Sequence, residues 1–301
     1  MKSISTIILF FAMVGVTYGQ QQGPLSHYQL PQPYNQTAPS DPDLRNLVWN
    51  KWDTGNFTIL SLDANQGKYL HANIEQMKKW VMTRWGFPDV KHSAECRVLC
   101  VPNKELMKKL FRLERSHGEV RRDKSGKITM SVLWLVLDQK PAEVIPPSLT
   151  LVCLAELENQ GVKVGYWATR GMSVLNGSLP QVRSQLAALN ANMASDQKVY
   201  FSQKLFSMTE EEWKKETPEK RLLFDREAAA LCLLLRKEYG QANLHKFMQS
   251  GGGEQNFNQI YGFRGYQEFD ATLRRYMTNL SNDVSQNRTP DSYLQISPPM
   301  P

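Results

Sequence analysis

The sequence predicts an α+β fold, with a mixed α/β subdomain over residues 45–140 and a helical subdomain over residues 141–280. Strand-like and helix-like segments alternate in the first of these regions, and the strand-like segments carry the short apolar patterns of sheets. After Asp138 the strand patterns stop, and the remaining apolar segments have helical spacing. Strands first and helices afterwards are typical of the α+β class.

Five elements are expected before residue 140. A half-buried strand is indicated at 56–62 and a helix at 66–86, which ends at Gly86. A second strand follows at 96–102, and the next helix, with Asn103 as its N-cap, is expected to end at Gly118. Residues 118–127 are polar and suggest a solvated hairpin or loop. The segment 127–138 is apolar on both faces, which predicts an interior strand.

The second half is expected to be helical. Residues 146–161 begin with two prolines, carry a long apolar run and end at Gly161, which favours a buried helix. Thr209 and Glu212 form a capping-box pattern at the start of another helix. The longest helix is expected at 218–239, followed by a short helix that ends in glycines and a last amphipathic helix over 265–280.

Both ends of the chain are expected to lie outside the folded part. Residues 1–19 have the charge, apolar run and small residues of a secretory signal peptide, and the run is short for the alternative, a membrane anchor. A secreted or periplasmic protein without a stable membrane span is therefore predicted. Residues 20–44 and 281–301 are polar and rich in proline, which predicts a disordered leader and a disordered tail.

Composition argues against several classes of site. The net charge of +7 is spread over scattered basic residues without interleaved aromatic residues, so nucleic acid binding is not expected. The five histidines show no ligand spacing. Free, buried thiols are expected for the four cysteines, with a bridge between Cys153 and Cys232 as the alternative, since Cys96 and Cys100 would lie roughly 13 Å apart on one strand.

The segments "YWATRGMSVL", "REAAALCLLLRKEYGQANLHKFM" and "ITMSVLWLVLD" carry a resemblance to gluzincin-type zinc metallopeptidases of the peptidase-MA-like group, which extends over roughly residues 49–277. "YWATRGMSVL" is similar to the W-x-x-E-G-M-A segment of that family, and "REAAALCLLLRKEYGQANLHKFM" resembles its closing helices. "ITMSVLWLVLD" resembles the strand that borders its active-site cleft. The resemblance implies a zincin-like (thermolysin-like) fold.

The family hydrolyses peptide bonds with zinc held by an H-E-x-x-H helix and a third carboxylate ligand. The matching helix contains no histidine. The two histidine positions fall on Leu151 and Ala155, with Val152 at the position of the general base, or on Ser148 and Val152, with Leu149 as the base. The third ligand position is Arg170, whose guanidinium is always positive and cannot donate a lone pair. The resemblance thus implies a pseudoenzyme without zinc or another cofactor.

We expect Arg170 to fill the space of the lost metal and to pair with Glu156 or Glu158; the alternative is that it points to solvent. The two glutamates could also be a catalytic pair, although a solvated helix end is the simpler interpretation. The residual cleft would lie between the strand 128–137 and the helix 147–159.

The predicted function is binding or scaffolding of an extracellular or periplasmic polypeptide, as an extended peptide or a protein in that cleft. A divergent peptidase or hydrolase with unrecognised catalytic residues is the alternative. A third possibility is a structural component of an envelope or coat.

Overall fold

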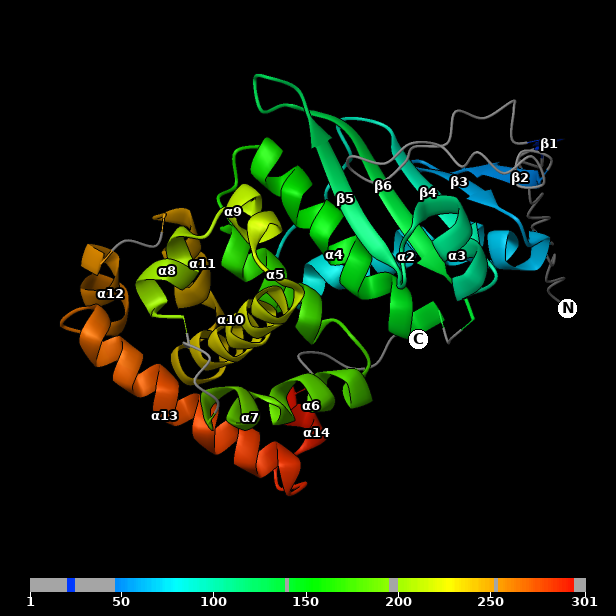
Figure 1. Ribbon diagram of the computed structural model, residues 1–301. Coiled ribbons are helices and arrows are strands. Elements are labelled where there is room, and N and C mark those ends of the chain that lie inside the picture. The colour runs from blue at the N-terminus through cyan, green and yellow to red at the C-terminus, as the bar shows by residue number, and fades with distance from the viewer. Residues whose placement is uncertain (1–20, 25–46, 139–140, 195–199, 252–253, 295–301) are drawn as a thin grey trace, which may run out of the picture.

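The computed structural model describes residues 21–24, 47–138, 141–194, 200–251 and 254–294 (Figure 1). The predicted signal peptide, residues 1–19, lies outside the described residues, as does most of the predicted leader. No helix in the described ranges is long and apolar enough to cross a membrane.

The described elements show the α+β class that the sequence predicts. The strands are β1 (Gln21–Pro24), β2 (Val48–Asp53), β3 (Phe57–Ser61), β4 (Cys96–Val101), β5 (His117–Arg122) and β6 (Ile128–Val136). The helices are α2 (Ala64–Arg84), α3 (Lys104–Phe111), α4 (Pro141–Asn159), α5 (Tyr166–Leu175), α6 (Leu179–Ala187), α7 (Leu189–Ala194), α8 (Ser202–Ser207), α9 (Glu210–Lys215), α10 (Pro218–Tyr239), α11 (Gln241–Gln249), α12 (Glu254–Tyr261), α13 (Tyr266–Ser285) and α14 (Asp291–Leu294).

The six strands form one mixed sheet in the order β1-β2-β3-β4-β6-β5. β3, β4 and β6 are parallel, and the other neighbours are antiparallel. β6 therefore lies inside the sheet, as its apolar pattern predicts. β5 stands at one end of the order, so one of its edges has no neighbouring strand among the described residues.

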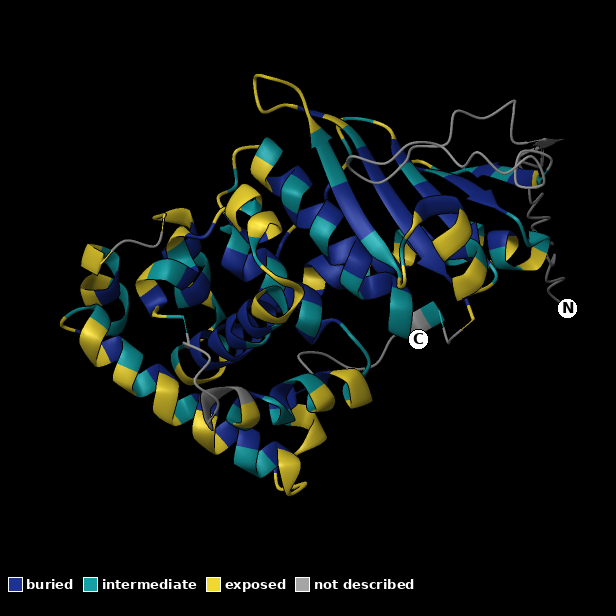
Figure 2. Ribbon diagram, in the orientation of Figure 1, coloured by how far each residue is buried: buried dark blue, intermediate teal, exposed yellow. Residues whose placement is uncertain are grey.

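Both faces of the sheet are covered, and this explains why its inner strands are apolar throughout. Along β4, Val98 and Cys100 join the core under α2 and α4, whereas Leu99 and Val101 pack with α3 on the other face. Alternate side chains of a strand point to opposite faces, so a strand buried on both sides has no polar stripe. Figure 2 shows these strands as buried along most of their length.

The helical half is built around α10, which is buried along most of its middle (Figure 2). α5 packs closely along it. At Gly171 a Cβ would lie 2.4 Å from the carbonyl oxygen of Ala228, so only glycine allows this approach of the two backbones. α6, α7 and α13 lie around the far side of α10 (Figure 1).

The boundary between α3 and β5 differs from the prediction. The Asn103 cap is confirmed, because its side chain accepts the N–H of Leu106 at 2.9 Å. The helix nevertheless ends at Phe111, where Arg112 adopts a left-handed conformation with φ of 52°. The residues before Gly118 that were expected to be helical include a turn and the start of β5.

Both predicted disordered ends also contain regular structure. Gln21–Pro24, within the predicted leader, pairs with β2 as an antiparallel strand. α13 extends to Ser285 and α14 follows at Asp291–Leu294, although residues 281–301 were expected to lack structure. Buried side chains hold this end in place: Val284 is 3% and Leu294 1% exposed.

Candidate functional site

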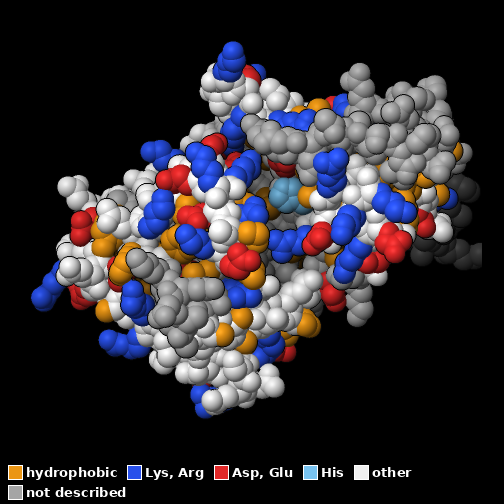
Figure 3. All heavy atoms as spheres, viewed as in Figure 1, with side chains coloured by type: hydrophobic (Ala, Val, Ile, Leu, Met, Phe, Trp, Pro, Cys, Tyr) orange, Lys and Arg blue, Asp and Glu red, His pale blue; other side chains and the backbone are white. Residues whose placement is uncertain are grey.

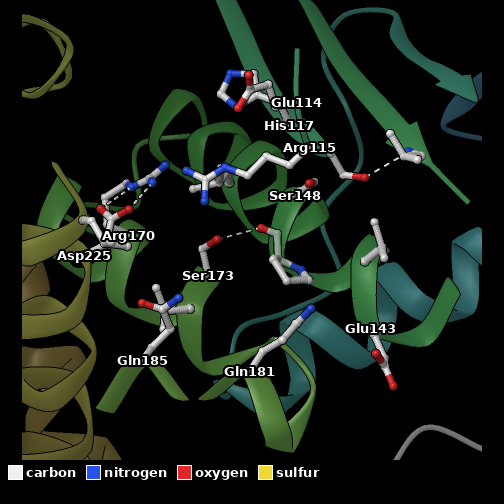
Figure 4. A pocket seen from close by; sticks show the side chains of 18 of the residues that line it. Glu114, Arg115, His117, Glu143, Ser148, Arg170, Ser173, Gln181, Gln185 and Asp225 are labelled. Carbon is white, nitrogen blue, oxygen red and sulfur yellow. Dashed lines mark hydrogen bonds and ion pairs between the residues drawn. The ribbon is translucent and has the colours of Figure 1, made fainter. Parts of the chain in front are cut away.

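A cavity of about 370 Å³ lies where the sheet meets the helical half of the molecule. It is bordered by the start of β5, the end of β6 and the facing sides of α4, α5, α6 and α10 (Figure 4). Figure 3 shows this face of the molecule hollowed between the two halves, with both basic and acidic side chains around the hollow. The cavity thus lies between the two subdomains that the sequence predicts.

A smaller cavity of about 70 Å³ continues along β5. The two cavities share three lining residues, His117 on β5, Leu151 on α4 and Arg170 on α5. We call the two cavities together the β5 groove. The smaller cavity is bordered by successive β5 residues, so the groove follows the edge of the sheet at which the described residues form no further strand.

The structure brings together three of the four residues predicted at the positions of a lost metal site. Leu151, Ala155 and Arg170 all line the smaller cavity. Leu151 and Ala155 are half-buried, whereas Val152 between them is fully buried in the core. Of the two registers, the one with Leu151 and Ala155 therefore faces the groove. In the other register, Val152 points away from it.

Arg170 is largely buried and forms a two-point ion pair with Asp225 of α10. Its Nε donates to Oδ1 at 2.8 Å and its Nη2 donates to Oδ2 at 2.5 Å, and the side chains are 11% and 8% exposed. The guanidinium also lies 4.1 Å from the ring centre of Trp213, whose indole N–H donates to Asp225 at 3.2 Å. Burial alone would lower the pKa of Arg170, but the charge and hydrogen bonds of Asp225 raise it above its usual value.

The partner of Arg170 thus differs from the prediction. Glu156 is fully buried and accepts the backbone N–H of Ser93 at 2.9 Å. Glu158 accepts the N–H of Gly165 at 3.1 Å and lies 4.0 Å from Arg122. Each carboxylate serves a neighbouring loop or strand, and neither forms the ion pair with Arg170. The correct partner, Asp225, lies 55 residues further along the chain.

His117 lines both cavities and is kept neutral by its surroundings. Its ring stacks on Trp134 with 6.0 Å between ring centres. Burial, followed by the positive charges of Arg170 and Arg115, lowers its pKa to about 4. A histidine that is neutral down to this pH does not switch charge near neutrality.

The cysteines are poorly suited to nucleophilic chemistry. All four are free and buried, so the alternative bridge between Cys153 and Cys232 is wrong. Burial raises the pKa of Cys100 to about 12 and raises the pKa values of the other three thiols as well. A thiol needs its anionic form to attack or to bind a metal, and these remain protonated.

Within the described ranges, no group of three or more His, Cys, Asp or Glu side chains could hold a metal ion. The β5 groove is lined by charged and hydrogen-bonding side chains, and it runs beside the outer edge of β5. Ser148 and Ser173 line the larger cavity, and the Ser173 hydroxyl donates to the carbonyl oxygen of Pro147 at 2.9 Å.

Sequence reasoning identified neither Asp225 nor Arg115, a second arginine that lines the larger cavity. Asp225 stands in the apolar run of α10 and is 6% exposed. An acidic residue within such a run indicates a buried partner of opposite charge. Comparison of this chain with models of known families and with curated proteins found no match.

Proposed function

We propose that this protein holds an extended segment of another polypeptide in the β5 groove without cleaving it. The observation that carries this proposal is the edge of β5 that has no neighbouring strand in the part of the chain that the structure describes. A strand with unpaired backbone N–H and C=O groups can accept one further strand, and side chains of the added strand then enter the adjoining cavities. The groove provides such cavities along most of the length of β5.

We propose further that the groove is what remains of a gluzincin-like active site. Support comes from the shared cavity of Leu151, Ala155 and Arg170, since these are the positions that the resemblance assigns to the three zinc ligands. Leucine and alanine side chains have no lone pair for zinc. The guanidinium of Arg170 would repel a divalent cation, and its ion pair with Asp225 fixes it in place.

Secretion or export to a periplasm fits this function and stays a prediction. Detection of the mature amino terminus at or near Gln20 in the exported protein would test this point.

Binding can be tested with a pooled library of synthetic octapeptides, selected on the immobilised protein and identified by mass spectrometry. We expect a set of retained peptides and protection of the β5 backbone amides from hydrogen exchange in their presence. Ala155→Trp would fill the smaller cavity and abolish retention. Ala271→Trp, at an exposed position of α13, is the matched control and should retain the same peptides.

The same preparation tests the absence of cleavage. Retained peptides should be recovered intact, and the protein should contain less than stoichiometric zinc by elemental analysis. Stoichiometric zinc together with cleavage that a chelator stops would establish the alternative, a divergent metallopeptidase. Failure to retain any peptide would remove the binding proposal itself.

A further inference from the structure

One arginine of the groove forms no ion pair with the residues that the structure describes. Arg115 lies in the turn before β5, lines the larger cavity and is exposed. Among the described residues it forms no ion pair. Figure 4 shows its side chain reaching across the cavity, with the guanidinium pointing toward that of Arg170. Two guanidinium groups therefore face one space, although only one carboxylate, that of Asp225, is bound to them.

Most acidic side chains near this point are engaged elsewhere. Along β5 and its neighbours, the ion pairs are Glu119 with Arg121 at 3.6 Å, Glu158 with Arg122 at 4.0 Å and Glu210 with Lys214 at 2.9 Å. The larger cavity also contains the carboxylates of Glu114, Asp138 and Glu143. Of these, Glu114 lies 3.9 Å from Lys108, and Glu143 lies across the cavity from Arg170 in Figure 4.

The pKa of His117 reflects the charged groups around it. After burial, the causes that lower its pKa are all positive charges, those of Arg170, Arg115, Lys214 and Arg221. The lining of the larger cavity as a whole is mixed, with three basic and four acidic residues. Around His117, however, the charges that act most strongly are positive, so an anion is favoured at that end of β5, beside Arg115. A single carboxylate of a ligand would complete the pairing of Arg115.

The direction of a strand that adds to β5 decides which end of a peptide meets this charge. In an antiparallel pair, the carboxyl-terminal end of the added strand lies beside the amino-terminal end of β5, at His117. A parallel strand would bring its amino-terminal end, with a positive ammonium group, to the same place. Arg115 and Arg170 disfavour that arrangement.

We infer that the groove selects peptides with a free C-terminal carboxylate, which run antiparallel to β5 and place that carboxylate against Arg115. This inference rests on the proposed peptide binding and adds the direction and the chemical end group of the ligand. Arg115 is the primary contact, because two of the donors of Arg170 already bind Asp225. Arginine matches a carboxylate with two parallel N–H donors.

The test uses two octapeptide pools of the same random composition, one with free C-terminal carboxylates and one with C-terminal amides. All peptides are acetylated at the amino terminus, so that only the carboxyl end differs. Individual retained sequences are then synthesised in both forms and titrated against the protein. We expect amidation to weaken binding about tenfold or more, the usual effect of losing a charge-assisted hydrogen bond pair.

Arg115→Gln should bring the free acids down to the affinity of the amides and leave the amides unchanged. Arg264→Gln, an exposed arginine between α12 and α13, removes the same charge and should preserve the difference. Equal binding of acids and amides by the unaltered protein would overturn the inference and leave peptide binding intact. A preference for acids that survives in Arg115→Gln would overturn the assignment to Arg115. If neither pool is retained, the proposed function fails.

Discussion

Replacement of Arg170 by alanine tests whether its ion pair with Asp225 supports the junction of α5 and α10. Both side chains are nearly buried, and the guanidinium makes two hydrogen bonds to the carboxylate besides its contact with the Trp213 ring. In Arg170→Ala the carboxylate of Asp225 keeps the indole N–H of Trp213 as a partner and loses both charged donors. A buried charge without its counter-ion is strongly destabilising.

The expected loss can be estimated from comparable pairs. Removal of one member of a buried ion pair costs about 3–5 kcal/mol of the free energy of unfolding. For a folded region of this size, a loss of 1 kcal/mol lowers the melting temperature by about 2–4 °C. The variant should therefore melt between about 6 and 20 °C below the unaltered protein. A guanidinium that pointed to solvent would change the melting temperature by less than about 4 °C.

Urea unfolding followed by circular dichroism measures the free energy directly, and differential scanning calorimetry gives the melting temperature. Arg288→Ala is the matched control. Arg288 also makes two hydrogen bonds to one aspartate, Asp283, but the side chains are 59% and 44% exposed. The control should cost less than about 1 kcal/mol. If Arg170→Ala and Arg288→Ala lose the same free energy, the argument from burial is refuted.

Three further predictions concern other parts of the fold. Burial raises the pKa of Glu227 to about 8, above its usual 4.5. Between these two pH values the folded state retains a proton that the unfolded state loses. The free energy of unfolding therefore falls as pH rises from about 4.5 to about 8. Glu227→Gln should remove this loss, with equal stabilities near pH 4.5 and a more stable variant at pH 8 in urea titrations. Gly118→Ala should cost about 1–3 kcal/mol, because its Cβ would lie 2.5 Å from the carbonyl oxygen of Ser148, whereas Gly55→Ala, with its nearest atom at 3.7 Å, should be nearly neutral. Asn176→Ala should lower the free energy of unfolding by about 1–3 kcal/mol, since the buried amide accepts the Trp85 N–H at 3.2 Å and donates to Thr150 at 2.7 Å; unchanged stability would contradict that reasoning.

Local sequence patterns predicted the elements that depend on local physics. The capping box of Thr209 and Glu212 is present, and the longest helix runs over Pro218–Tyr239 as expected. Caps and helical periodicity depend on residues within one or two turns, so the sequence carries them directly. The interior position of β6 followed from apolar residues on both of its faces.

The start of β5 was missed because its signal is weak over a short range. Residues 112–118 continue the polar and apolar spacing of α3, and no glycine or proline ends the helix at Phe111. The left-handed conformation of Arg112 stops the helix instead, at a residue type that rarely adopts it. The pairing of β5 with β6 then decides the structure, and such long-range pairing is invisible in a local window.

The strands and helices at the two ends were missed for a different reason. β1 pairs with β2 through its backbone, and a polar, Gln-rich sequence can supply such pairing as well as an apolar one. α14 is four residues long, and its order depends on contacts such as the hydrogen bond from Arg183 to the carbonyl oxygen of Thr289 at 2.7 Å. Neither the pairing of β1 with β2 nor the hydrogen bond of Arg183 can be predicted from composition alone.

The candidate site differs from the prediction in its bordering strand and in the partner of Arg170. The cleft was expected between the strand 128–137 and the helix 147–159, whereas the cavities lie between β5 and α4 and only the end of β6 borders them. Arg170 was identified because the resemblance assigns its position to a zinc ligand, and an arginine side chain cannot bind zinc. Its partner was sought on α4, the helix nearest in the sequence, although α5 packs along α10. Gly171, next to Arg170, lies against the backbone of Ala228. Asp225 precedes Ala228 by one helical turn and therefore lies on the same face of α10. A buried guanidinium requires an acidic partner, and that partner must lie on a helix that packs against the helix of the arginine. The partner is therefore decided by helix packing more than by distance along the chain.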